Sequence, residues 1–219
     1  MARPKHKLHF KEKLSYKKYL KVLKYLDEKS IIIAKKKNPT VKLELNTIAN
    51  VRASIFLLMH TGLRVSEIRL IKNEDILRAV KEQEFWVYEP KKKGMRRVEL
   101  SNALSEIFKE FFKEYLNELK NENYIIRIYN KPTTPLSQNY LQVLINRHLK
   151  DALGAGHTTH GFRRYIITRL IKIADAKKAQ VVANHKDIAT TMLYLNVLEK
   201  GDAGKALESL IENERTIYS

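Results

Sequence analysis

The sequence predicts a mainly α-helical fold with one small β-hairpin or sheet, an α+β architecture. Apolar residues recur at helical spacing along most of the 219 residues. Between residues 84 and 100 the pattern changes to that of two paired strands around a turn. The hydrophobic fraction of 44% is sufficient for a packed core. No internal repeat or domain linker interrupts the pattern, so we expect one α-rich domain.

The first predicted helix lies in LSYKKYLKVLKYL, which begins at Leu14. Its apolar stripe includes Val22 and Leu26, lysines stand between them, and Pro39 ends the region. Residues 1–42 hold fourteen Lys or Arg and three acidic residues, so 14 − 3 = 11 of the net charge of +18 lies there. The lysine face is either a solvated surface or a surface that contacts phosphates, because each neutralised phosphate releases counterions.

The next elements are mostly helical. The stretch LNTIANVRASIFLLMHTG is apolar at helical spacing and stops at Gly62, a strong C-terminal signal. EFWVYE and RRVEL flank PKKKGM, which predicts a hairpin with a lysine-rich tip, and we expect Trp86 and the other aromatic residues in the core. YIIRIYNKPTTP predicts a short strand and a turn. Further helices are expected at residues 65–71, 102–122, 137–152, 175–184, 187–197 and 203–213.

Two arginines lie at the heads of apolar helical rows. In HGFRRYIITRLIK, with Thr159 as the expected N-cap, His160 and Arg163 share the face that continues as the apolar stripe. A buried guanidinium without an anion is very unfavourable, so Arg163 needs one. Arg64 heads a similar row, and Glu67 could pair with it one helical turn later. The spacing alone leaves open whether the anions are carboxylates or a phosphate.

A phosphate partner would allow a particular chemistry. Two guanidiniums can bind two oxygens of one phosphodiester and stabilise the extra charge of its transition state. A tyrosine can act as the nucleophile, although its ordinary pKa of about 10 means that cations and a neutral histidine must help to remove its proton. A lysine at the hairpin tip could protonate the leaving oxygen. No carboxylate or His cluster has metal-ligand spacing, so we expect no metal and no cofactor.

Four blocks of the sequence together resemble the catalytic domain of the tyrosine recombinase, or phage-integrase, family. In chain order they are TGLRVSEI, YEPKKKGMRRVEL, HGFRRY and ANHKDIATTMLYLNV. The nine residues from His185 to Tyr194 match the usual spacing of the family. Each block alone would be a weak signal, but their order over residues 61–197 is specific. The resemblance implies the tyrosine recombinase catalytic-domain fold.

The resemblance also implies a role for each matching residue. Tyr194 would be the nucleophile, Arg64, Arg163 and His185 would hold and stabilise the phosphate, and Glu67 would support Arg64.

The proton carriers and DNA contacts follow from the same match. His160 would act in proton transfer, and Lys91 would protonate the leaving oxygen, with Lys92 and Lys93 as open alternatives for that role. Basic residues outside the catalytic positions are interpreted as DNA contacts, namely Lys92, Lys93, Arg164 and Lys186.

The implied activity is site-specific DNA recombination or integration. Tyr194 would form a 3′-phosphotyrosyl bond and free a 5′-hydroxyl, and a partner strand would reverse the step without ATP or metal. The resemblance implies double-stranded DNA as the partner, and we expect it to be bound by a homo-tetramer that is monomeric when free. We expect a basic tail at residues 1–13, the catalytic domain at 14–200 and a C-terminal helix at 201–219 that passes to a neighbouring protomer.

Two other function classes stay open at this point. A type IB topoisomerase-like enzyme shares the catalytic set but relaxes DNA on its own. A catalytically inactive DNA-binding accessory protein would bind DNA without cleaving it. A plain basic helical protein that binds RNA leaves the four blocks without an explanation.

The sequence departs from the family pattern in three places. Ala183-Asn184 stands where Leu-Gly is usual, and Arg164 stands where a second His is common. The stretch before Thr61 has room for the first helices of the catalytic domain and a basic tail, whereas family members usually carry a separate N-terminal DNA-clamping domain. We therefore expect a catalytic fragment, a naturally short recombinase, or a subunit that relies on something else to hold DNA, for which the basic leading segment is a partial substitute.

Composition limits the setting of the protein. No apolar run approaches the roughly 18 residues of a membrane span, and MARPKHKLHF lacks the apolar core of a signal peptide. There is no Cys, so no disulfide or thiolate site is expected. We expect a DNA-associated cytoplasmic protein without a membrane partner, in the host cytoplasm if it is viral. Abundant Lys, Ile and Glu with little Gly are typical of thermophilic proteins, and we expect an archaeal or thermophilic virus or plasmid as the source.

Overall fold

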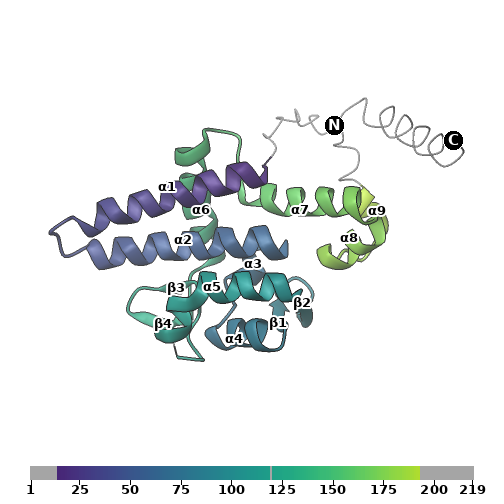
Figure 1. The fold of residues 1–219 in the computed structure, drawn as a ribbon, viewed down its shortest axis with the longest axis horizontal. Helices are drawn as coiled ribbons and strands as arrows, with labels where there is room; N and C mark the ends of the chain where they lie inside the picture. The colour runs from purple at the N-terminus through teal and green to yellow at the C-terminus, as the bar shows by residue number, and fades with distance from the viewer. Residues whose placement is uncertain (1–13, 119, 193–219) are drawn as a thin grey trace, which may run out of the picture. The chain divides into compact units, whose positions relative to one another are not determined.

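The computed structural model of the chain describes residues 14–118 and 120–192. These residues belong to two compact units, whose boundary in the sequence lies between Ile166 and Ile167, within α7. Figure 1 shows the elements in chain order. They are α1 (Tyr16–Ala34), α2 (Val41–Thr61), α3 (Val65–Ile68), α4 (Asn73–Lys81), β1 (Glu84–Glu89), β2 (Gly94–Glu99), α5 (Asn102–Glu118), β3 (Arg127–Ile128), β4 (Lys131–Pro135), α6 (Gln138–Leu153), α7 (Thr159–Ile173), α8 (Ala176–Ala183) and α9 (Ile188–Met192). The mainly helical fold with small antiparallel hairpins is confirmed.

The first two helices of the first unit run side by side (Figure 1). The Ser15 hydroxyl caps α1 by accepting a hydrogen bond from the Lys18 backbone N–H at 3.2 Å. Val22 and Leu26 are fully buried, as the predicted stripe requires. Helix α2 ends at Gly62, which adopts the left-handed conformation with φ of 64°. The predicted stop is therefore confirmed, and its physical reason is the freedom of glycine at positive φ.

Aromatic side chains fill the space between α2 and α5. The rings of Phe56 and Phe111 stack at 3.8 Å between centroids, and Phe108 and Phe112 meet Phe56 edge-on at 5.1 and 5.3 Å. Offset and edge-on aromatic pairs add to the stabilisation that burial alone gives. This cluster makes α2 a rigid support for the turn that follows it, where the predicted site residues begin.

The β1–β2 hairpin was predicted, but the position of Trp86 was predicted wrongly. The strands pair antiparallel with Glu84 opposite Glu99 and Glu89 opposite Gly94. Because side chains alternate along a strand, Phe85, Val87 and Glu89 face inward, and Trp86 is 43% exposed. An aromatic residue that is apolar by type therefore lies outside the core, because its register on the strand places it there.

Helix α4 and the second hairpin go beyond the sequence prediction. The stretch NEDILRAVK, which was not predicted as a helix, forms α4, and Ile76 and Ala79 are its buried apolar residues. Helix α5 ends at Glu118 rather than at Glu122. The stretch YIIRIYNKPTTP folds into two short paired strands, β3 and β4, where one strand and a turn were expected.

Helix α7 begins at Thr159, so this residue is not the N-cap that was predicted. The Asn146 side chain on α6 instead accepts the Thr159 backbone N–H at 3.0 Å, which satisfies one free donor of the first turn. The Asn146 side chain thus replaces a local N-cap, and its hydrogen bond fixes the start of α7 on α6.

The second unit contains the end of α7 with α8 and α9. Its small core holds Ile167, Ala179 and Ala183, against which Leu170 and Ile171 pack. Asp175 caps α8 by accepting the Lys178 N–H at 2.6 Å.

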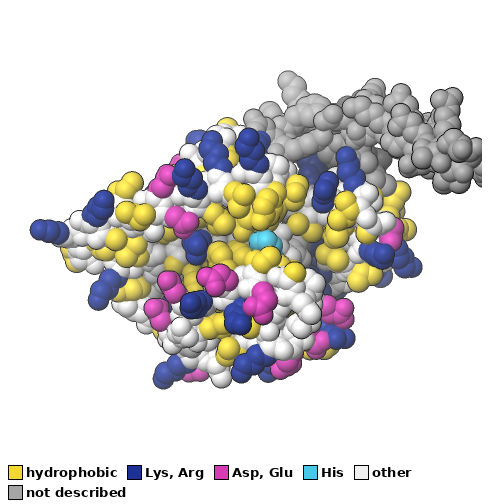
Figure 2. All heavy atoms as spheres, viewed as in Figure 1, with side chains coloured by type: hydrophobic (Ala, Val, Ile, Leu, Met, Phe, Trp, Pro, Cys, Tyr) yellow, Lys and Arg dark blue, Asp and Glu magenta, His cyan; other side chains and the backbone are white. Residues whose placement is uncertain are grey.

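Charged side chains of both signs are mixed on the face shown in Figure 2. Lys and Arg lie beside Asp and Glu there rather than in one continuous patch. None of the helices in the described part of the chain combines the length and the apolar character needed to cross a membrane.

Candidate active site

A pocket in the first unit brings together four residues that the sequence analysis had singled out. Arg64, Lys91, His160 and Arg163 all line one cavity of about 220 Å³. They come from three separate places in the chain: the turn after α2, the tip of the β1–β2 hairpin, and the first turns of α7. The other lining residues are Leu58, Leu63, Val65, Ser66, Gln138, Gln142 and Thr159.

Arg64 is held by a carboxylate, as its spacing from Glu67 predicted. Its Nη1 lies 2.7 Å from Glu67 Oε1, and its backbone N–H donates to Glu67 Oε2 at 2.8 Å. Burial alone would raise the pKa of Glu67, but the hydrogen bonds and charge of Arg64, with the charge of Arg96, hold that pKa below its ordinary value. Glu67 is therefore an ionised anchor that fixes the direction of the Arg64 guanidinium.

Arg163 is only 3% exposed and is anchored to the same turn. Its Nη1 donates to the Gly62 carbonyl oxygen at 2.6 Å. The left-handed Gly62 stands two residues before Arg64, so one short turn supports both guanidiniums. The two arginines share one pocket able to receive an anion, which is the arrangement that a bidentate phosphate site requires.

His160 is exposed and lies one helical turn before Arg163 on α7. The loop before it is tied to α1, because Lys18 Nζ lies 2.9 Å from His157 Nε2. Leu14, just before α1, packs on Gly161, where an added Cβ would lie 3.0 Å from Leu14 Cδ1. These contacts, together with Asn146, set the position of the first turn of α7.

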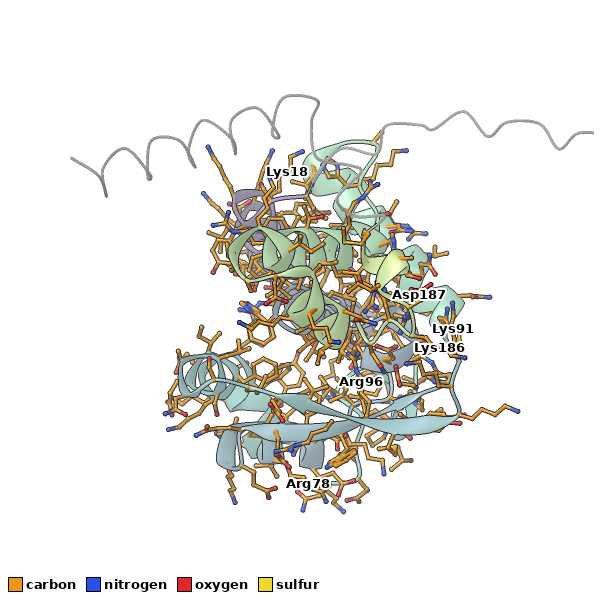
Figure 3. The ribbon with its side chains drawn as sticks, turned by 90° about the vertical axis from the view of Figure 1, so that its right-hand side faces the viewer. Lys18, Arg78, Lys91, Arg96, Lys186 and Asp187 are labelled. Carbon is orange, nitrogen blue, oxygen red and sulfur yellow. The ribbon has the colours of Figure 1, made fainter. Side chains whose placement is uncertain are left out.

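Among the three adjacent hairpin lysines, Lys91 is the one that lines the pocket with Arg64 and Arg163. Figure 3 labels Lys91 at the end of the hairpin. The neighbouring Lys92 has its Nζ 4.0 Å from Glu89 Oε2. Lys93 occupies the turn itself with φ of 51°. The sequence could not separate the three, because the shape of the turn decides which side chain faces the pocket.

His185 belongs to the second unit, where α8 and α9 hold it. Its Nδ1 lies 2.9 Å from the Thr191 hydroxyl, and Thr191 is fully buried. The Gln180 side chain donates to the His185 carbonyl oxygen at 3.1 Å, and the His185 N–H donates to the Gln180 carbonyl oxygen at 3.1 Å. Thr191 was not singled out from the sequence, although the adjacent threonines Thr190 and Thr191 in the block ANHKDIATTMLYLNV were a usable signal.

Asn184 stands where the family pattern has Gly, and its backbone conformation shows why Asn is accepted there. It is the C-cap of α8 and has left-handed backbone angles, φ of 49° and ψ of 47°. Glycine is the ordinary choice at such a position, and Asn is among the few other residues that adopt it readily. The replacement therefore keeps the turn that leads into His185.

The remaining predicted residues lie elsewhere or outside the described chain. Arg164 is half-buried on α7, and Lys186 lines a second cavity with Lys177, Gln180, Asp187 and Ile188. Tyr194 lies outside the described residues, as do the basic tail at 1–13 and the C-terminal residues 201–219. Gln138 and Gln142 line the pocket but were not singled out, because exposed amides on a helix carry no distinctive sequence signal.

Comparisons with known proteins agree with this fold. The XerA recombinase structure has a TM-score of 0.64 and 18% identity, and the match covers 98% of this chain and 67% of that one. The XerH site-specific recombinase bound to a palindromic difH substrate gives 0.63 and 20%, covering 90% of this chain and 52% of the XerH chain. A lambda integrase dimer bound to a COC′ core site gives 0.56 and 20%, covering 84% and 58%.

This chain thus spans about half of the XerH chain and somewhat more of the lambda integrase chain. No curated protein sequence matches it. The model of the Phage integrase family matches residues 15–200. The chain belongs to the phage integrase family, the tyrosine recombinases.

Proposed function

We propose that this pocket binds the scissile phosphodiester of double-stranded DNA and that the protein cuts and rejoins strands through a 3′-phosphotyrosyl intermediate at Tyr194. The observation that carries the proposal is the convergence of Arg64, Lys91, His160 and Arg163 on one cavity. Membership of the family supports site-specific recombination as the biological outcome.

Charge stabilisation is the first part of the mechanism. The transition state at phosphorus carries more negative charge on its oxygens than the ground state does, so fixed cations lower the barrier. Arg64 is held in place by Glu67, and Arg163 by the Gly62 carbonyl. Because both guanidiniums are already oriented, little reorganisation accompanies the reaction.

Proton movement is the second part. Tyr194 transfers its phenolic proton to His160 while its oxygen forms a bond to phosphorus. The bond from phosphorus to the 5′ oxygen breaks, and Lys91 protonates that oxygen as it leaves. The 5′-hydroxyl of a partner strand reverses each of these transfers in the rejoining step.

His185 is the third phosphate ligand in this proposal. The hydrogen bond between its Nδ1 and Thr191 supports Nε2 as the ring nitrogen that meets the phosphate. With Nδ1 accepting from the hydroxyl, Nε2 carries the proton and donates to a phosphate oxygen.

The remaining proposals concern assembly and place. DNA is the partner, as it is for the XerH and lambda integrase complexes. We propose a homo-tetramer on two DNA sites, with residues 201–219 exchanged between protomers, acting in the cytoplasm where its DNA lies. Lys92, Lys93, Arg164 and Lys186 are proposed to contact DNA phosphates.

The test is trapping of a covalent adduct. The protein is incubated with a nicked suicide substrate that carries its site, and the products are run on a denaturing gel. We expect a shifted band in the wild type and in Tyr16→Phe, whose ring is 49% exposed on α1, and none in Tyr194→Phe. DNA binding without a band for any substrate would identify an accessory protein instead.

A further inference from the structure

Glu89 is a buried acid at the end of β1, next to the lysine-bearing tip of the hairpin. It is 4% exposed and stands opposite Gly94, two residues before Lys91. An ionised carboxylate is very unfavourable in the interior unless cations compensate for it. The mechanism proposed above gives Glu89 no role.

The cations around Glu89 come from three elements. Glu89 Oε1 lies 3.8 Å from Arg64 Nη1, and Glu89 Oε2 lies 4.0 Å from Lys92 Nζ. On β2, burial lowers the pKa of the Arg96 guanidinium, and the charges of Glu67 and Glu89 offset part of that effect. Figure 3 shows Arg96 on the hairpin and Lys91 at its end. Glu89 therefore faces both a phosphate-binding arginine and the hairpin tip.

Glu67 holds Arg64 by two hydrogen bonds, since it accepts from the Arg64 side chain at 2.7 Å and from its backbone N–H at 2.8 Å. The distance of 3.8 Å between Glu89 and Arg64 is an ion pair rather than a hydrogen bond. Glu89 itself belongs to the hairpin, and its carbonyl oxygen accepts the Lys92 backbone N–H at 3.1 Å, a main-chain bond of the turn that a side-chain substitution leaves in place. Glu67 does not belong to the hairpin, so it cannot position the hairpin tip as Glu89 can.

We propose that Glu89 is a positioning residue that ties the lysine-bearing hairpin tip to Arg64, so that Lys91 lies beside the bound phosphate. This inference rests on the proposed function, because it deepens the role of the same pocket. When Glu89 loses its charge, Arg64 stays on Glu67, but the tip loses its attraction to the pocket. Protonation of the leaving 5′ oxygen is then impaired more than phosphate binding.

The test compares Glu89→Gln with Glu84→Gln. Glu84 is on the same strand and is held by an arginine, since Arg97 Nε donates to it at 2.6 Å, but it shares the outward face with Trp86. Each protein cleaves two suicide substrates in single turnover. One has a normal scissile phosphodiester, and the other has a bridging sulfur in place of the 5′ oxygen. A thiolate leaves without a proton donor, because the pKa of a thiol is only about 8.5.

We expect Glu89→Gln to slow cleavage of the normal substrate by about ten- to one-hundredfold, a part of the full contribution of a general acid. On the sulfur substrate its rate should return to within a few-fold of wild type. Lys91→Ala should show the same selective rescue, and Glu84→Gln should cleave both substrates at the wild-type rate. DNA affinity of Glu89→Gln should stay near that of Glu84→Gln.

Equal slowing on both substrates, or no slowing on either, would overturn the inference and leave the proposed function standing. Absence of an adduct from the wild type with both substrates would instead overturn the proposed function. If Glu89→Gln does not fold, Glu89→Asp, which keeps the charge, is measured in the same way and should show a smaller but equally selective defect. If neither variant folds, Glu89 serves stability alone and the inference is wrong.

Discussion

Two single residues, Asn184 and Thr191, set the position and orientation of His185. Asn184 supplies the left-handed turn at the end of α8, and Thr191 fixes one nitrogen of the imidazole from a fully buried position. The motif predicted that His185 matters, but the reason for its orientation lies in a hydroxyl six residues later. The contact between Thr191 and His185 depends on how the α8–α9 turn folds, and the spacing of residues in the sequence does not predict that fold.

The backbone conformation of Asn184 leads to a stability prediction. Asn184→Gly should leave the free energy of unfolding within about 0.5 kcal/mol of wild type, whereas Asn184→Ala should lower it by about 1 kcal/mol, because left-handed angles disfavour Ala. Denaturant unfolding of the two variants measures the difference. An Ala variant as stable as the Gly variant would contradict the assignment of a left-handed cap.

The hydroxyl of Thr191 leads to a prediction on activity. Thr191→Val removes the hydrogen bond at nearly constant volume and should slow cleavage about tenfold, while Thr191→Ser should restore most of the rate. The slowed variant should also have an altered pH profile, because the His185 ring no longer has a fixed tautomer. If Val and Ser variants cleave alike at every pH, Thr191 has only a packing role.

At the scale of elements, α1 is packed against α2 and α6 through two histidines that stay neutral. Tyr19 on α1 lies 3.2 Å from His60 Nε2 on α2, and Tyr25 on α1 meets the His148 ring on α6 at 6.0 Å between centroids. Burial lowers the pKa of His60 to about 4. Burial, with the charges of Lys29 and Arg147, lowers that of His148 to about 4 as well. In the folded protein both histidines therefore stay unprotonated down to about pH 4.

These histidines predict that stability falls in mild acid. Between about pH 6.5 and pH 4 the unfolded chain binds a proton at each of them and the folded chain does not. The free energy of unfolding should therefore have its full value above pH 6.5 and should decrease steadily as the pH falls to 4. In His148→Gln and His60→Gln, that slope should be smaller than in wild type. An unchanged slope in both would show that the two rings titrate normally in the folded state.

The elements also show what a sequence can and cannot predict. Helix α2 with its Gly62 stop was predicted because one residue, with one backbone conformation, ends it. Trp86 was misplaced, because a shift of one residue on a strand reverses its face. Four pocket residues were identified from their sequence blocks, namely Arg64, Lys91, His160 and Arg163. Their meeting in one pocket depends on tertiary contacts, such as those of Arg163 with Gly62 and of Asn146 with Thr159.

At the scale of the whole molecule, the net charge of +18 favours binding to polyanions such as DNA and says little about the fold. Residues 1–13 carry five basic residues and one acid, and they lie outside the described structure. Their basic composition suits the neutralisation of DNA phosphates.

Deletion of residues 1–13 should weaken DNA binding and flatten its salt dependence. Each lost phosphate contact lowers the slope of log K against log salt by about 0.9 for duplex DNA. Binding measured at several salt concentrations, with the deletion and the intact chain side by side, gives the number of contacts. Equal slopes would mean that the tail does not touch the phosphates.

The central claim is that Arg64 and Arg163 stabilise negative charge on a DNA phosphate during attack by Tyr194. A methylphosphonate at the scissile position removes one non-bridging charge, so it removes the need for a compensating cation. Arg163→Ala should be nearly inactive on the normal phosphodiester and should form the Tyr194 adduct readily on the methylphosphonate. If Arg163→Ala is equally impaired on both substrates, the arginine does not act by charge stabilisation and the account is contradicted.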